Sequence, residues 1–234
     1  MHLFYHSPIL DKSFLLEKEE NHHLIKVLRK SAGDEILFTD GEGYLYECRI
    51  EELTMKKTII SVLDKKLQIK NPFHIHLAIA PTKNADRMEW MVEKAVEIGV
   101  DRITLIKTAH SERNYLKSER LEKKAISALK QSLKYYKTII DQENNFESLV
   151  SAPNIANTEK FIAYVDENLP HHLIEMANKK SNYLILIGPE GDFSAEEITL
   201  ALSNGFKPCS LGPSRLRTET AGIVAVHSLN LINI

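Results

Sequence analysis

Two short apolar segments each run into a Gly-Pro pair, and these segments contain the residues best suited to bind a ligand. Residues 184–193 read LILIGPEGDF, and residues 210–221 read SLGPSRLRTETA. Glycine allows a ligand to approach the main chain, while proline fixes its own φ and pushes the preceding residue toward extended geometry. One such turn would indicate only a tight connection from a strand to a helix. Two of them, with four charged residues in or beside the turns, favour a functional site; these residues are Glu190, Arg215, Arg217 and Glu219.

The two segments do not match the common phosphate-binding patterns. Neither contains GxGxxG or GxxxxGK[ST], so a dinucleotide or P-loop site is not indicated. The two cysteines, Cys48 and Cys209, are far apart and lack a CxxC spacing, and the ten histidines show no ligand spacing. We therefore expect no metal site, and we expect both thiols to be reduced and buried as small apolar side chains.

Alternating strands and helices are predicted around the two segments. This alternation predicts a parallel α/β sheet, in which ligands bind at the carboxyl ends of the strands. Ser194 and Glu197 have the spacing of a capping box, and Thr218 is positioned to cap the last helix. The expected strands span 74–80, 102–107, 161–165, 183–187 and 208–211, and the expected helices span 86–98, 117–136 and 218–232. Residues 130–137 (KQSLKYYK) are basic with interleaved tyrosines, which could bind RNA, but a solvated helix face is the favoured interpretation.

The first seventy residues have a different pattern, which is typical of a small β-barrel. Strands are expected at 35–40, 44–51 and 58–63, and one short helix is expected at 19–29. Residues 65–72 are polar and end in Asn-Pro, which predicts a linker. The sequence therefore predicts two domains, residues 1–70 and residues 71–234.

Composition and charge are those of a globular protein. Of the 234 residues, 43% are hydrophobic and 26% are charged, which permits a sizeable core. Because 30 basic residues face 32 acidic ones, a general polyanion binder is not indicated, and RNA binding would need local basic patches. The N-terminal residues lack a signal-peptide pattern, and the longest apolar runs are shorter than a membrane span. We expect a cytoplasmic protein that does not contact membranes.

The segments IGPEGDFS and LGPSRLRTETA resemble the signature segments of the SPOUT superfamily, and specifically of the RsmE family of 16S ribosomal RNA uridine-N3 methyltransferases. The resemblance extends over nearly the whole chain, including residues 23–34 (HLIKVLRKSAGD) and 83–100 (KNADRMEWMVEKAVEIGV). The chain departs from the family pattern at Asp192, where the second glycine of GPEGG is expected, and at Lys130, where the family has an acidic residue.

The resemblance implies an α+β protein of two domains, with an N-terminal PUA-like β-barrel that binds RNA. The C-terminal domain would be a SPOUT α/β domain with a deep trefoil knot, a rare exception to the usual connection rules. The implied cofactor is S-adenosylmethionine (SAM). The implied partners are 16S ribosomal RNA in the small ribosomal subunit and a second copy of the chain in a homodimer, and no metal is required.

The resemblance also implies roles for individual residues. Arg217 would stabilise the uridine anion, and Glu219 would act as a base or orient the substrate, although a carboxylate in the first turn of a helix is an equal alternative. The expected cofactor residues are Leu186, Ile187, Gly188, Glu190, Gly191, Leu211, Gly212, Leu216 and Thr218. The expected RNA-binding residues are His23, Arg29, Lys83, Arg87 and Arg113. Core packing is the alternative for Leu186, Ile187 and Leu211, and a surface salt bridge is the alternative for each basic residue.

Two other functions remain open. The first is a SPOUT methyltransferase that acts on another RNA site, or on ribose instead of a base. The second is an RNA-binding assembly factor that keeps the fold without turnover, against which the intact GPEG and RTET sequences argue.

Overall fold

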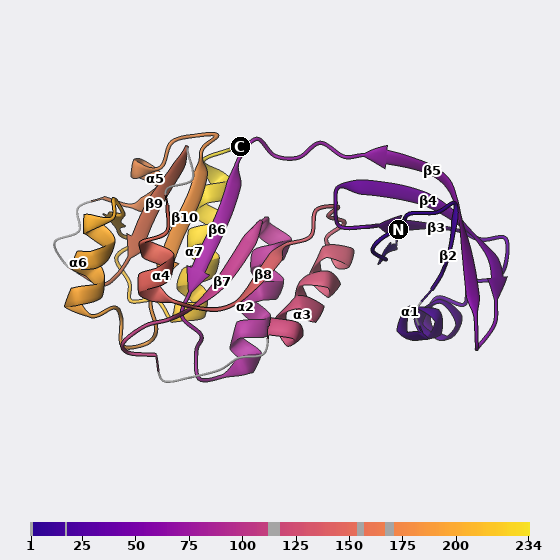
Figure 1. The fold of residues 1–234 in the computed structure, drawn as a ribbon, viewed down its shortest axis with the longest axis horizontal. Coiled ribbons are helices and arrows are strands. Elements are labelled where there is room, and N and C mark those ends of the chain that lie inside the picture. The colour runs from indigo at the N-terminus through magenta and orange to yellow at the C-terminus, as the bar shows by residue number, and fades with distance from the viewer. Residues whose placement is uncertain (1, 17, 112–117, 154–156, 167–170) are drawn as a thin grey trace. The chain divides into compact units, whose positions relative to one another are not determined.

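The computed structural model describes residues 2–16, 18–111, 118–153, 157–166 and 171–234, which form two compact units (Figure 1). Unit 1 contains Met1–Lys70 and Leu129–Lys137, and unit 2 contains Asn71–Ala128 and Thr138–Ile234. The segment 129–137, which the sequence placed in the second domain, thus belongs to unit 1. Within the described ranges, every helix is too short or too polar to cross a lipid bilayer.

Unit 1 is built on a five-stranded sheet with the order β1-β3-β4-β5-β2. Strand β1 runs parallel to β3, and the other pairs are antiparallel. The strands are β1 (Leu3–Tyr5), β2 (Ser13–Leu15), β3 (Glu35–Thr39), β4 (Tyr44–Leu53) and β5 (Thr58–Leu67). Strand β5 runs further than expected, into the predicted linker. Phe38, Ile50 and Ile60 from three of the strands are fully buried and form the core together with Leu24.

Leu24 lies in a short helical stretch that consists of two parts. Helix α1 (Lys18–His22) continues directly into a π-helical turn, η1 (His23–Val27). Leu24 is fully buried against the sheet, whereas Val27 on the same turn is exposed. The stretch ends earlier than the predicted helix 19–29, and Arg29 adopts a left-handed conformation with φ 50.

Helix α3 (Ser118–Gln131) also ends earlier than predicted. Leu133 adopts the left-handed conformation with φ 54 and closes a Schellman motif. The Lys134 N–H donates to the carbonyl of Leu129 at 3.0 Å, and the Leu133 N–H donates to that of Lys130 at 3.4 Å. Glycine usually occupies this position, so the leucine concealed the helix end. The interpretation of 130–137 as a solvated helix face is therefore wrong beyond Gln131.

The residues after α3 pack on the turn between β3 and β4. The Gly43 N–H donates to the Tyr135 carbonyl at 2.9 Å, and the Tyr136 hydroxyl donates to the Gln68 carbonyl at 2.9 Å. Gly43 has φ 100, and a Cβ there would lie 2.3 Å from Cζ of Tyr136. The absence of a side chain at Gly43 therefore allows the Tyr136 ring to pack against this turn.

Unit 2 contains a six-stranded sheet with the order β11-β9-β10-β6-β7-β8. All neighbouring strands are parallel, as the alternation of strands and helices predicts. The strands are β6 (His74–Ile79), β7 (Arg102–Lys107), β8 (Ile139–Asn145), β9 (Thr158–Ala163), β10 (Asn182–Ile187) and β11 (Lys207–Cys209). Because the strands are parallel, the carboxyl ends of β9, β10 and β11 meet at one edge of the sheet.

Helices cover both faces of this sheet (Figure 1). Helices α2 (Ala85–Ile98) and α7 (Thr218–Leu231) pack on one face, where Gly222 of α7 lies directly against Leu77 and Ile79 of β6. Helices α4 (Phe146–Val150) and α6 (Ala195–Ser203) pack on the other face, and α5 (Leu173–Met176) contacts α7. The two-domain α+β architecture is confirmed, and the knot stays a prediction because strand order and register do not describe how the chain is threaded.

Helix caps and cysteines provide further comparisons with the sequence. The capping box of Ser194 and Glu197 is confirmed at the start of α6. The predicted cap at Thr218 is wrong, because Thr218 is the first residue of α7 and Arg217 is its N-cap, without a capping side-chain bond. Both cysteines are free and buried as expected, and burial raises the pKa of each thiol to about 12.

Candidate functional site

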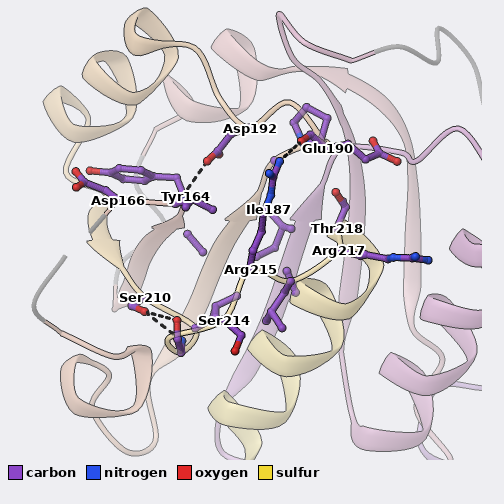
Figure 2. Close-up of a pocket in the computed structure, with 18 of the residues that line it drawn as sticks. Tyr164, Asp166, Ile187, Glu190, Asp192, Ser210, Ser214, Arg215, Arg217 and Thr218 are labelled. Atoms are coloured by element: carbon purple, nitrogen blue, oxygen red, sulfur yellow. Dashed lines mark hydrogen bonds between the residues drawn. The ribbon is translucent and has the colours of Figure 1, made fainter. Parts of the chain in front are cut away.

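A cavity of about 900 Å³ lies at the carboxyl ends of β9, β10 and β11 (Figure 2). Its wall consists of three loops: residues 163–166 after β9, residues 187–190 with Asp192 after β10, and residues 210–218 after β11, with Ala221 of α7. This volume is in the range of small-molecule sites, and the wall combines apolar side chains with main-chain groups and a few charges.

Seven of the nine residues expected to bind a cofactor line this cavity, together with Arg217. The seven are Ile187, Gly188, Glu190, Leu211, Gly212, Leu216 and Thr218. Leu186 is instead fully buried in the core cluster that contains Ala78 and Phe146, as its alternative interpretation predicted. Gly191 lies beneath His110, and a Cβ added to it would be 3.2 Å from the His110 Cβ.

Gly212 shows why the loop after β11 requires glycine. Its φ is 126, a conformation that side-chain-bearing residues rarely adopt. The Ser210 hydroxyl accepts the Gly212 N–H at 3.1 Å and thereby holds the turn. The main chain at Gly212 is therefore exposed to the cavity without a covering side chain.

The loop after β10 is held by residues that follow two other strands, β7 and β9. The Nδ1 atom of His110, which follows β7, lies 3.1 Å from the Gly191 carbonyl and 3.0 Å from the Asp192 carbonyl. Because carbonyl oxygens only accept, Nδ1 must carry the proton. The Val165 N–H, after β9, donates to the Asp192 carboxylate at 2.9 Å. These contacts fix the loop in advance of ligand binding.

Charges of opposite sign occupy different loops of the cavity wall. Asp166, Glu190 and Asp192 follow β9 and β10, whereas Arg215 and Arg217 follow β11. Arg215 reaches between the loops and donates to the Glu190 carbonyl at 3.3 Å (Figure 2).

The pKa of Tyr164, which follows β9, is affected by the negative charges on this side of the cavity. Burial, followed by the charges of Asp166 and Asp192, raises the pKa of its phenol above the ordinary value. In Figure 2 the Arg217 side chain extends away from Tyr164 and Asp166.

Glu219 does not line the cavity. Its side chain is only 7% exposed and pairs with Arg87 of α2, with 3.8 Å between Arg87 Nε and Glu219 Oε1. The structure thus joins a residue expected to act in catalysis with a residue expected to bind RNA.

The other expected RNA-binding residues lie in both units. Lys83 is exposed just before α2 in unit 2, and Arg29 is exposed in unit 1. His23 begins η1 in unit 1, but its side chain lies outside the described residues, as does the whole of Arg113.

The sequence did not identify the loop after β9 as part of the site, and it gave no role to Asp192, which lies in the first Gly-Pro segment. The expected strand spanned 161–165, whereas β9 ends at Ala163, and nothing in the local pattern showed that this strand lies next to β10. The sequence indicated only that residues at the carboxyl end of a strand in a parallel sheet can bind a ligand. The strand order was needed to show which of these strand ends lie together.

Family models match most of the chain. A model of an RNA methyltransferase domain matches residues 69–230, and a model of an RNA methyltransferase PUA domain matches residues 16–64. The first model alone covers more than half of the sequence.

Individual proteins resemble the chain over nearly its full length. Ribosomal RNA small subunit methyltransferase E of Mesomycoplasma hyopneumoniae is 30% identical over 90% of this chain and 94% of its own. A crystal structure described as a probable rRNA-methyltransferase from Porphyromonas gingivalis is 43% identical over 99% of both chains, with a TM-score of 0.91. A methyltransferase structure from Legionella pneumophila with the bound cofactor SAM is 27% identical over 99% of this chain and 97% of that chain, with a TM-score of 0.88.

Proposed function

The chain belongs to the RNA methyltransferase family that includes ribosomal RNA small subunit methyltransferase E, and from this premise we propose that it uses SAM to methylate N3 of a specific uridine in 16S ribosomal RNA. The named relatives act on ribosomal RNA of the small subunit. The uridine and its N3 atom come from the resemblance of the two signature loops to the RsmE family.

The observation that carries this proposal is the cavity formed by the two Gly-Pro loops at the ends of β10 and β11. SAM has a flat adenine, a positively charged sulfonium and an amino-acid end. Ile187, Leu211 and Leu216 offer apolar surface for the adenine, and the main chain at Gly188 and Gly212, which lines the cavity, offers hydrogen-bonding groups. The residues present therefore fit the cofactor.

The cofactor supplies an electrophilic methyl group, and the protein must prepare the uridine nitrogen to receive it. N3 carries a proton on the Watson–Crick edge, which is reachable only in an unpaired or flipped base. Loss of this proton leaves negative charge on the uracil. We assign stabilisation of this charge to Arg217, whose guanidinium extends from the cavity wall.

We assign a positioning role to Glu219. Its carboxylate is buried and directed to the Arg87 guanidinium, so it holds Arg87 at the start of α2. Arg87 and Lys83, both exposed at this end of α2, would contact RNA phosphates, and Arg29 would do so from unit 1. His23 and Arg113 stay in the proposed RNA-binding set on the resemblance alone. We also propose that the enzyme is a cytoplasmic homodimer.

Isothermal titration calorimetry with SAM tests the proposal. SAM should bind at micromolar concentration, whereas ATP, which shares the adenosine but carries several negative charges, should not bind a wall with three carboxylates. Ser214→Trp, on the cavity wall, should weaken SAM binding, and Ser203→Trp, exposed at the end of α6, should not. An absence of heat with SAM and the wild-type protein would contradict the proposed function.

A further inference from the structure

Asp192 joins the loops after β9 and β10 through its side chain. Its Oδ1 accepts the Phe193 N–H at 2.8 Å, and its Oδ2 accepts the Val165 N–H at 2.9 Å. Figure 2 shows Asp192 on the wall of the cavity. The residue adopts a left-handed conformation with φ 62, which glycine and asparagine also accept. This backbone conformation and the two bonds hold the carboxylate in one position on the cavity wall.

No cationic side chain neutralises this carboxylate within the part of the chain that the structure describes. Its two hydrogen-bond donors are main-chain amides, which carry no net charge. Arg215, the nearby cation of the cavity wall, donates to the Glu190 carbonyl instead. Asp192 takes part in none of the ion pairs between described residues. The wall therefore presents a fixed negative charge to whatever occupies the cavity.

The neighbouring phenol responds to this charge. The negative charges of Asp166 and Asp192 add to the effect of burial in raising the pKa of Tyr164, which disfavours a second anion there. A fixed charge on the wall of a partly enclosed site acts more strongly than the same charge in water. A positively charged group in the cavity should accordingly be stabilised.

We propose that Asp192 sets the preference of the site for SAM over its demethylated product, S-adenosylhomocysteine. This inference rests on the proposed function. The two molecules share the adenosine and the amino-acid end and differ only in the methyl group and the positive charge on sulfur. Methyl transfer removes that charge, so the attraction to Asp192 is present before the reaction and lost after it. Asp192 is therefore a specificity-determining residue that favours release of the spent cofactor.

Calorimetry with SAM, S-adenosylhomocysteine and sinefungin, in which a protonated amine replaces the methylsulfonium, tests this role. Asp192→Asn removes the charge, tolerates the left-handed conformation and keeps one acceptor oxygen. It should weaken the binding of SAM and sinefungin about tenfold, which corresponds to about 1.4 kcal/mol of lost attraction. The affinity for S-adenosylhomocysteine, which lacks the positive charge on sulfur, should change by about threefold or less. Asp192→Gly, which leaves the backbone unstrained, should give the same change in the ratio of the two dissociation constants.

The matched control is Glu196→Gln, which removes one charge from the first turn of α6, outside the cavity wall, and should leave the ratio unchanged. Equal weakening of all three ligands by the Asp192 variants would mean that the carboxylate acts only by joining the loops, and it would overturn the proposal. An unchanged ratio would do the same. If the wild-type protein bound neither SAM nor its product, the proposed function itself would fail, before any variant is compared.

Discussion

Arg217 follows the second Gly-Pro turn and is the N-cap residue of α7, where its side chain makes no capping bond. The side chain is exposed, and we propose that its guanidinium contacts the substrate. Arg217→Ala should lower kcat by about 100-fold to 1000-fold, the usual effect of removing one group that stabilises charge in the transition state. SAM affinity should change little, because the charge in question develops on the uracil. Single-turnover methylation of 16S ribosomal RNA and calorimetry measure the two quantities.

The control for this variant lies two residues earlier in the same loop. Arg215 donates to the Glu190 carbonyl across the cavity wall. Arg215→Ala should therefore change SAM affinity more than kcat. A variant Arg217→Ala with near-normal kcat would remove Arg217 from the catalytic assignment.

The pair of Arg87 and Glu219 makes a prediction about stability. Arg87→Ala leaves the buried Glu219 carboxylate without its cation, and the free energy of unfolding should fall by about 1–2 kcal/mol, less than for a fully buried pair because Arg87 is 44% exposed. Adding Glu219→Gln removes the uncompensated charge and should restore part of the loss. Urea unfolding measures both variants. A double variant that is no more stable than Arg87→Ala would show that the buried Glu219 carboxylate does not need the positive charge of Arg87.

At the level of elements, a chain of polar side chains joins β6, β7 and β8. His76 Nε2 lies 2.7 Å from Thr104 Oγ1, which donates to Asp141 at 2.5 Å, and Arg102 Nε donates to Asp141 at 2.6 Å. Burial, followed by the charge of Arg102, lowers the pKa of His76 to about 4. The folded protein therefore keeps this imidazole neutral at a pH where the unfolded chain protonates it.

This difference predicts a pH dependence of stability. Between about pH 6.5 and pH 4 the unfolded chain binds a proton that the folded chain does not, so the free energy of unfolding falls as the pH falls through this window. The contribution of His76 is at most about 3 kcal/mol. His76→Leu should flatten the dependence in urea unfolding measured from pH 7 to pH 4. An unchanged slope would show that His76 does not cause it.

The packing of Tyr136 on the β3–β4 turn predicts a difference between two glycines. Gly43 and Gly33 both have positive φ, 100 and 93, so alanine is strained at either position. Only Gly43 has a neighbour within the reach of a Cβ, the Tyr136 ring. Gly43→Ala should therefore destabilise the protein by about 1–3 kcal/mol more than Gly33→Ala. Equal losses in chemical unfolding would contradict the packing account.

The sequence predicted those elements whose ends carry local signals. Helix α2 (Ala85–Ile98) agrees with the predicted span 86–98 to within one residue; it follows the N-cap Asn84, whose side chain accepts the Asp86 N–H, and its C-cap residue is Gly99. The end of α3 could not be predicted in this way, because Leu133 replaces the usual glycine of the Schellman motif. Strands β1 and β2 contain three residues each, too few for an alternating pattern to appear.

In the candidate site, too, the sequence predicted the features that have a local pattern and missed those that depend on the tertiary structure. Gly212 could be recognised because a Gly-Pro turn after an apolar run is a local pattern. Tyr164 could not, since its place on the wall depends on the pairing of β9 with β10, and the orientation of Asp192 depends on the left-handed conformation at residue 192. Leu186 and Ile187 are neighbours on β10, so their side chains lie on opposite faces of the sheet. Only the packing on each face shows that Leu186 belongs to the core and Ile187 to the cavity wall.

For the whole molecule, the two units correspond to two activities that the proposed function requires. Unit 2 contains the cavity and the pair of Arg87 and Glu219, and it contains most of the region that matches an RNA methyltransferase domain. Unit 1 contains the region that matches a PUA domain of RNA methyltransferases. Because the net charge is only −2, RNA recognition requires local basic groups, and we propose Arg29, Lys83 and Arg87 for this role.

The proposed substrate can be tested by mass spectrometry of 16S ribosomal RNA from a strain that lacks the gene. One N3-methyluridine of the small subunit should disappear, return when the wild-type gene is restored, and not return with Arg217→Ala. Persistence of every N3-methyluridine in the deletion strain, or the loss of a different modification such as a ribose methyl group, would overturn the proposed function.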